Sequence, residues 1–288
     1  MELKNKIQTI QNLIKINNFS LAITNCKKLI KKYPNNSFIY NLCGLALQAD
    51  KKILESIEYF TKAIYYESEN LAAMNNLANS FKALSKLNEA EDLYLRVIEK
   101  DPKNVKTLNN YGNLKQRFND FNAAIHLYQR ALKVDNNNIN ILFSLASTYQ
   151  GVGKFDEAKK IINQILKLDP NNTASHKLLS GFINYKDNQD HLGVMENLLK
   201  NDHLDSSKKI DLHFALGKAY EDMKDYDSSF KNLEVANKLK KEKINYQILD
   251  DEKTFNSIIK TFKDIDLESF KKLQSDKEII FICGMPRS

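Results

Sequence analysis

Apolar and polar positions along this chain recur with two periods. Over short segments the apolar residues follow the 3.6-residue spacing of an amphipathic helix, as at Ile57, Phe60 and Ile64. Over longer distances, residues of similar size recur every 34 positions. Small residues form one column at Gly44, Ala78, Gly112, Ala146 and Ser180 and another at Ala22, Ser56, Ala90, Ala124 and Ala158, and large residues form a third at Phe60, Tyr94, Tyr128 and Ile162. We therefore expect each repeat to be a pair of helices that approach closely at the small residues, because a larger side chain would push the backbones apart.

The prolines mark the ends of these repeats. Pro34, Pro102 and Pro170 lie at multiples of 34, where a helix is expected to stop. The pattern divides the chain into seven units: 3–36, 37–70, 71–104, 105–138, 139–172, 173–209 and 210–243. The sixth unit is degenerate, because Leu192 replaces the small residue and Glu196 the large one. Residues 187–190 are expected to lengthen its loop.

A period of 34 residues is the length of a tetratricopeptide helix–turn–helix unit, and these columns resemble that repeat family closely. The resemblance implies an all-α solenoid, a right-handed superhelix with one concave surface, in which neighbouring units bury each other's apolar faces. The array is expected to occupy residues 1–243. Residues 244–276 are expected to form capping and linker helices, with one apolar stripe at Phe255, Ile258, Ile259 and Phe262.

Composition agrees with a helical, soluble protein. Hydrophobic residues make up 42% of the chain, which is enough for a packed core, and eight Gly and four Pro are too few for a turn-rich all-β domain. Cys26, Cys43 and Cys283 form neither a disulfide framework nor a metal-binding pair, which predicts a reducing, cytoplasmic environment. The longest apolar run, residues 279–285, is too short to span a membrane.

Charge and histidine content argue against two further classes of function. The formal net charge is +7, but the lysines lie beside acidic residues along the chain, which is typical of a solvated helical surface and predicts no nucleic-acid partner. His191 and His203 have no Cys or His partner at metal-ligand spacing, so no metal site is expected. His126 is expected to face solvent, and His213 to pack within a repeat.

The last twelve residues, KEIIFICGMPRS, differ from the repeats. Residues 279–283 are β-branched or aromatic and are followed by Gly284, which is typical of a buried parallel strand. A strand followed by residues 284–288 resembles the opening of a loop whose backbone N–H groups surround a phosphate. The alternative is an ordinary exit from a strand into a turn, with Arg287 exposed.

The order of repeat array, helical linker and strand with GMPRS resembles the bacterial tetratricopeptide-repeat sulfotransferases, and residues 212–230 resemble the final repeat of that family. The resemblance implies that residues 277–288 begin an α/β, P-loop-like domain that binds the sulfuryl donor PAPS and needs no metal. It assigns Gly284 to a tight turn, Pro286 to stiffening the loop, Arg287 to catalysis beside the phosphosulfate bridge, and Ser288 to phosphate binding. The chain would then be the N-terminal part of a PAPS-dependent enzyme that sulfates a hydroxyl of tyrosine or a saccharide, and would be inactive alone.

Asparagines form three ladders on the first helices of the repeats. The ladders hold Asn41, Asn75 and Asn109; Asn76 and Asn110; and Asn79 and Asn113. An amide both donates and accepts, so these residues are candidates for holding an extended peptide of a protein acceptor in the concave groove. The alternative is that asparagine is common in this chain and these positions are solvated. A second reading of the whole chain also stays open: a non-enzymatic scaffold for protein–protein interaction.

Overall fold

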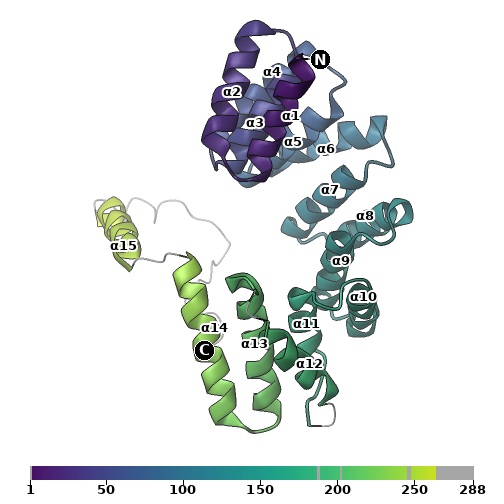
Figure 1. The fold of residues 1–288 in the computed structure, drawn as a ribbon, viewed down its shortest axis with the longest axis vertical. Coiled ribbons are helices and arrows are strands. Elements are labelled where there is room, and N and C mark those ends of the chain that lie inside the picture. Colours follow the sequence, from purple (N-terminus) through teal and green to yellow (C-terminus); the bar gives the residue numbers. More distant parts are fainter. Residues whose placement is uncertain (1, 187–188, 202, 245–247, 264–288) are drawn as a thin grey trace, which may run out of the picture. The chain divides into compact units, whose positions relative to one another are not determined.

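The computed structural model describes residues 2–186, 189–201, 203–244 and 248–263, and all regular structure in these residues is α-helical (Figure 1). In chain order the helices are α1 (Glu2–Lys15), α2 (Phe19–Lys32), α3 (Ser37–Ala49), α4 (Ile53–Tyr66), α5 (Leu71–Ala83), α6 (Leu87–Lys100), α7 (Val105–Arg117), α8 (Phe121–Val134), α9 (Ile139–Gly151), α10 (Phe155–Leu168), α11 (Thr173–Ser180), α12 (Asp190–Leu199), α13 (Ser206–Asp222), α14 (Tyr226–Ile244) and α15 (Ile248–Lys263). The predicted strand at 279–283 lies outside the described residues.

The helix boundaries confirm the 34-residue period. The first helices of the repeats, α3, α5, α7, α9 and α11, begin at residues 37, 71, 105, 139 and 173. Each of α3, α5, α7 and α9 packs against the helix that follows it, and α3, α5 and α7 each also pack against the next first helix. The predicted helix pairs are therefore present, and they stack on one another in sequence order.

Two further columns of residues define the ends of these helices. Five asparagines cap the first helices, each accepting a hydrogen bond from the backbone N–H three residues later: Asn36, Asn70, Asn104, Asn138 and Asn172. The turn between the two helices of a unit holds one residue with positive φ: Asn17, Lys51, Ser85, Asn119 and Gly153. Caps and turns thus repeat with the same period as the core, and the caps fix where the first helices start.

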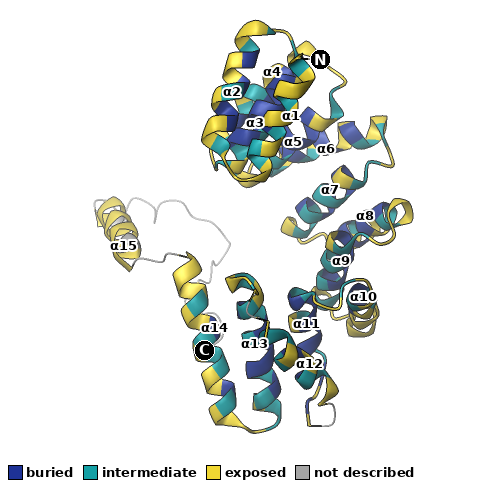
Figure 2. Cartoon of the chain, viewed as in Figure 1, coloured by how far each residue is buried: buried dark blue, intermediate teal, exposed yellow. Residues whose placement is uncertain are grey.

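The core lies where the small and large columns meet (Figure 2). Phe60, Tyr94 and Tyr128 are fully buried against the preceding helix. A Cβ atom added to Gly112 would lie 2.5 Å from Cε1 of Tyr128, and one added to Gly44 would lie at the same distance from Cε1 of Phe60. The predicted close approach at the small column is confirmed.

The degenerate unit departs from this geometry more than expected. Its first helix, α11, has eight residues and ends at Ser180, so the loop before α12 begins well before residue 187. Two contacts from α13 hold this loop: Lys218 Nζ donates to the carbonyl of Ile183 over 2.6 Å, and the Tyr185 N–H donates to Asp222 Oδ2 over 3.2 Å. The lengthening is due to a shortened helix as well as to the inserted residues.

The chain divides into two compact units, Met1–Ala236 and Asn237–Ser288. In the second unit, the stripe expected to cap the array lies on α15, where Phe255, Ile258 and Ile259 are exposed. The capping role of this helix stays a prediction. No described helix is both long and apolar enough to cross a lipid bilayer.

Candidate functional site

Asparagines of α3, α5 and α7 form a buried chain of hydrogen bonds. Asn76 Nδ2 donates to Asn41 Oδ1 over 2.9 Å, and Asn75 Nδ2 donates to Asn76 Oδ1 over 3.4 Å. Asn75 Oδ1 accepts from Asn110 Nδ2 and from Thr107 Oγ1, each over 3.1 Å. Asn41, Asn75 and Asn76 are 6%, 2% and 2% exposed, and this burial contradicts both a solvated position and direct contact of these three amides with a bound peptide. Their amides link three successive helices to one another.

Asn109, which shares a 34-residue ladder with Asn41 and Asn75, differs from those two residues. It is half-buried, and its Oδ1 is inaccessible to solvent and has no hydrogen-bond partner among the described residues. An unpaired buried acceptor costs about 1–3 kcal/mol. Asn109 therefore weakens the array locally where Asn75 strengthens it.

Asn79 and Asn113, the members of the third ladder, take no part in this network. The hydroxyl of Tyr94 donates to Asn79 Oδ1 over 2.5 Å, and that of Tyr128 donates to Asn113 Oδ1 over 2.6 Å. Burial raises the pKa of both tyrosines, so the phenols stay protonated donors. Each amide oxygen is thereby fixed on its tyrosine, and no described residue accepts a hydrogen bond from either Nδ2. Two half-buried N–H donors are presented in the same way by successive repeats.

Two of the helices that carry these amides, α5 and α7, also carry basic side chains and no acidic ones. α3, α5, α7 and α9 contain no Asp or Glu. Lys106 Nζ donates to Asn76 Oδ1 over 3.1 Å, and Arg117 donates to the carbonyl of Lys82 over 2.6 Å. Lys82 follows Asn79 by three residues and Arg117 follows Asn113 by four, so each cation lies on the same helix face as the amide.

The pKa values of Lys106 and Lys82 are both lower than that of a free lysine. Burial lowers the pKa of Lys106, and burial together with Arg117 lowers that of Lys82. No described carboxylate forms an ion pair with either lysine or with Arg117. By contrast Lys115, on another face of α7, pairs with Glu91 over 2.6 Å. An anion beside Lys82 would relieve the cost of holding that half-buried charge, and Lys106 is exposed and open to a second anion.

The degenerate unit contains a pair of histidines that the spacing of residues did not reveal. His176 Nε2 lies 2.8 Å from the carbonyl of Pro170, His176 Nδ1 lies 2.9 Å from His191 Nε2, and His191 Nδ1 lies 2.6 Å from Tyr185 Oη. Because the carbonyl only accepts, each hydrogen bond is satisfied when both rings are neutral and carry their proton on Nε2. Burial lowers the pKa of both histidines, which favours that state.

The remaining candidates contribute less to a site. His126 is exposed, as expected, and His213 is half-buried and donates from Nδ1 to Asn232 Oδ1 over 2.8 Å. The described residues contain no group of three His, Cys, Asp or Glu side chains that could hold a metal ion. Gly284, Pro286, Arg287 and Ser288 lie outside the described residues.

Comparison with known proteins identifies the repeats. Residues 117–180 and 210–243 match tetratricopeptide-repeat models, and residues 4–138 match the N-terminal tetratricopeptide-repeat region of Psidin. An uncharacterised protein of Aquifex aeolicus (strain VF5) is 34% identical over 105 residues, which are 36% of this chain and 14% of that protein. The chain therefore spans a small part of that relative's length.

Solved structures agree on the fold. PilF of Pseudomonas aeruginosa superposes with a TM-score of 0.60 at 15% identity, covering 68% of this chain and 90% of PilF. A tetratricopeptide repeat protein of Parabacteroides merdae ATCC 43184 superposes with a TM-score of 0.57 at 17% identity, covering 82% of this chain and 96% of that protein. The array is an all-helical tetratricopeptide-repeat solenoid, the kind of repeat that serves as a scaffold for protein–protein interaction.

Proposed function

We propose that the repeat array is a scaffold that binds an extended, acidic segment of a partner protein along α5 and α7. The observation that carries the proposal is the repeated pair of amide donors at Asn79 and Asn113, each fixed by a tyrosine hydroxyl. A donor presented once in each repeat suits the carbonyl groups of an extended backbone, which are available whatever the side chains are. Recognition of this kind depends little on the sequence of the bound segment.

Charge adds a preference to this recognition. Lys82, Lys106 and Arg117 lie on the faces that carry the amides, and α5 and α7 have no acidic residue to pair with them. Asp or Glu side chains of the bound segment would supply the missing partners. Lys106 is already hydrogen-bonded to Asn76, so a carboxylate there would join the buried network to the ligand.

The test uses a fluorescein-labelled twelve-residue peptide of alternating Asp and Gly, with a Lys–Gly peptide for comparison. We expect the full chain to bind the Asp peptide in a fluorescence anisotropy titration, and the double variant Asn79→Ala/Asn113→Ala to bind it at least about fivefold more weakly. Loss of two hydrogen bonds worth about 0.5–1.5 kcal/mol each corresponds to a weakening of about 5- to 150-fold.

The matched control is Asn88→Ala/Asn122→Ala, which removes two exposed amides from the second helices α6 and α8. The control variant should bind as the unaltered chain does, and circular dichroism should show that both double variants keep their helices. Equal binding by Asn79→Ala/Asn113→Ala and the unaltered chain, or a preference for the Lys–Gly peptide, would show that these amides and cations are not the docking surface.

We further propose that the parent protein is a PAPS-dependent sulfotransferase, in which the array orients the acceptor. The order of array, linker and KEIIFICGMPRS supports this second function, which rests on the sequence resemblance. Gly284 and Pro286 would shape the loop, Ser288 would donate to phosphate, and Arg287 would stabilise charge on the leaving bridge oxygen, as in the loose transition state of phosphoryl transfer. The acceptor would be a hydroxyl of tyrosine or a saccharide.

Two measurements on the complete gene product test the enzymatic proposal. The codons after Ser288 are expected to encode Gly-Thr-Thr, and PAP, the desulfated donor, is expected to raise the melting temperature. A bound ligand stabilises by RT ln(1 + [L]/Kd), or about 2.7 kcal/mol at a hundredfold excess over Kd. A different sequence after Ser288, together with no thermal shift by PAP, would leave the non-enzymatic scaffold as the function.

A further inference from the structure

The positive charge of this protein is concentrated in its first helix pair. Residues 2–33 contain seven lysines and one glutamate, a net charge of +6 out of +7 for the whole chain. The rest of the chain has a net charge of only +1, because its basic and acidic residues nearly cancel in number. A surface of this kind attracts anionic partners and speeds their association.

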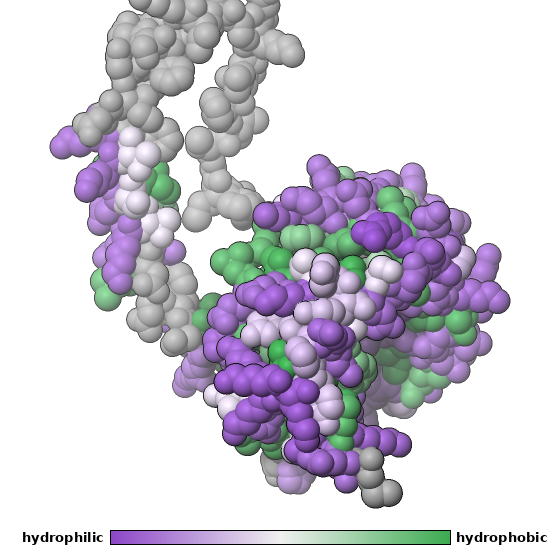
Figure 3. Space-filling view, turned by 90° about the horizontal axis from the view of Figure 1, so that it is seen from above, coloured by the Kyte–Doolittle hydropathy of each residue, from purple (hydrophilic) through white to green (hydrophobic). Residues whose placement is uncertain are grey.

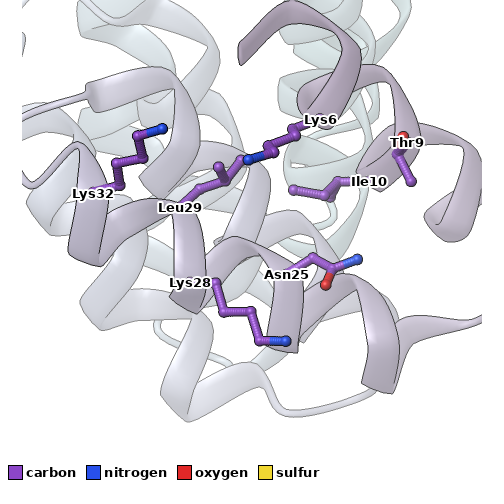
Figure 4. Close-up of a pocket in the computed structure, with 7 residues that line it drawn as sticks. All are labelled: Lys6, Thr9, Ile10, Asn25, Lys28, Leu29 and Lys32. Atoms are coloured by element: carbon purple, nitrogen blue, oxygen red, sulfur yellow. The ribbon is translucent and has the colours of Figure 1, made fainter. Parts of the chain in front are cut away.

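A cavity of about 320 Å³ lies between α1 and α2 (Figure 4). It is lined by Lys6, Thr9 and Ile10 from α1 and by Asn25, Lys28, Leu29 and Lys32 from α2. Ile10 and Leu29 form a recessed apolar floor, since they are 1% and 5% exposed. The side chain of Lys6 extends from α1 toward Leu29, so a positive charge lies directly beside the floor (Figure 4). Seen from the end of the unit that carries α1 to α4, hydrophilic side chains surround narrower apolar areas (Figure 3).

Glu2 places a carboxylate beside two of the lysines that line this cavity. Its Oε1 lies 2.6 Å from Lys6 Nζ and 3.5 Å from Lys32 Nζ, so one carboxylate bridges α1 and α2. Hydrogen bonding to Lys6 and the charge of Lys32 lower the pKa of Glu2. Lys28, on the same rim, has no carboxylate partner among the described residues. Lys6 and Lys32 thus already bind one carboxylate, and Lys28 is available to bind a second.

We propose that the α1–α2 surface binds an acidic amphipathic helix of a partner protein. The helix would place one apolar side chain in the cavity, over Ile10 and Leu29, and its carboxylates beside Lys28 and Lys32 and in the position of Glu2. A groove between two helices with an apolar floor and a charged rim is the geometry that receives the apolar face of a third helix. This surface is distinct from the amide surface of α5 and α7, and the inference is independent of the proposed function.

The geometry favours a helix over two other anionic partners. A nucleic-acid backbone needs phosphate contacts but no apolar cavity. An anionic membrane is bound by apolar side chains that project from the surface beside the lysines, whereas Ile10 and Leu29 are recessed. The anion already seated between Lys6 and Lys32 is a carboxylate, which is the charged group of an acidic protein helix.

The test measures binding of a labelled 18-residue helical peptide of Glu, Ala and Leu, with its leucines on one face, to the full chain by fluorescence anisotropy. We expect Lys28→Glu/Lys32→Glu to weaken binding at least tenfold, and Glu2→Gln to strengthen it severalfold by vacating the anion position. The matched control, Lys133→Glu/Lys167→Glu on α8 and α10, makes the same change in net charge and should alter affinity less than twofold.

A second pair of probes tests the cavity itself. A peptide with every Leu replaced by Ala should bind at least tenfold more weakly, and Asn25→Phe, which fills the cavity, should weaken binding of the Leu peptide. Equal weakening by the two charge-reversal variants, equal binding of the Leu and Ala peptides, or tighter binding of phosphatidylserine vesicles or of a 20-nucleotide single strand would overturn the proposal. Unchanged binding by Asn79→Ala/Asn113→Ala would confirm that the two surfaces are separate.

Discussion

Removal of the Asn75 side chain tests whether the buried amides hold the array together. Asn75→Ala deletes the acceptor of Thr107 and Asn110 and the donor to Asn76. Thr107 is fully buried, so its hydroxyl would be left without that partner at a cost of about 1–3 kcal/mol, whereas the half-buried Asn110 amide can turn to water. Alanine regains about 0.5 kcal/mol of helix propensity. We expect a net loss of about 1–3 kcal/mol.

The assay is urea and thermal denaturation followed by circular dichroism at 222 nm. For a unit of this size the loss corresponds to a fall in melting temperature of roughly 2–4 °C for each kcal/mol. Asn122→Ala, at an exposed position of α8, is the control for helix propensity and should leave stability unchanged or slightly raised.

A double-mutant cycle of Asn75→Ala with Thr107→Val makes the prediction specific. Valine removes the hydroxyl that Asn75→Ala would orphan, so the two changes together should cost less than the sum of the single changes, by about 0.5–1.5 kcal/mol. Strict additivity, or an Asn75→Ala variant as stable as the Asn122→Ala control, would refute the reasoning that the amides are structural links.

Three further changes test other parts of the fold. Gly112→Ala should be less stable than Gly151→Ala by about 1–3 kcal/mol in urea denaturation, because the new Cβ would lie 2.5 Å from the ring of Tyr128 at residue 112 and meets nothing within 4 Å at residue 151. Lys51→Gly should raise the melting temperature, since φ is +62° at this residue and a side chain there costs about 1 kcal/mol. Burial and a neighbouring imidazole lower the pKa of His191 to about 4 in the folded protein. The unfolded chain therefore binds a proton at His191 more tightly than the folded one. The free energy of unfolding should fall as the pH drops from about 6.5 to about 4. His191→Gln should flatten that profile in melting experiments from pH 7.5 to 4.5; an equally steep profile would contradict the assignment.

The sequence predicted the helices because one period governs every level of this fold. The core columns at Gly112 and Tyr128 require two helices to meet, and the caps and turns recur at the same interval. The capping asparagines recur every 34 residues in the sequence, but the many other asparagines make that column hard to recognise. A test for a shared interval, applied to every polar residue type, would have found it.

The site was predicted only in part, because position on a helix face does not determine burial. The interval placed Asn75, Asn76 and Asn79 on one helix, but which amide is buried depends on how closely the next helix approaches. The pairing of His176 with His191 arises in the degenerate unit, where the interval fails and no periodic argument applies. The basic first helix pair was visible in the sequence once charge was summed over each repeat instead of over the whole chain.

The amide chain that joins α3, α5 and α7 has a mechanical consequence. In a stack of repeats, bending requires neighbouring helices to slide past one another, and hydrogen bonds between their side chains oppose that sliding. The stretch of the array built from α3, α5 and α7 therefore resists bending. A long ligand that binds this stretch meets hydrogen-bonding groups whose spacing is already fixed, so binding costs the array little conformational entropy.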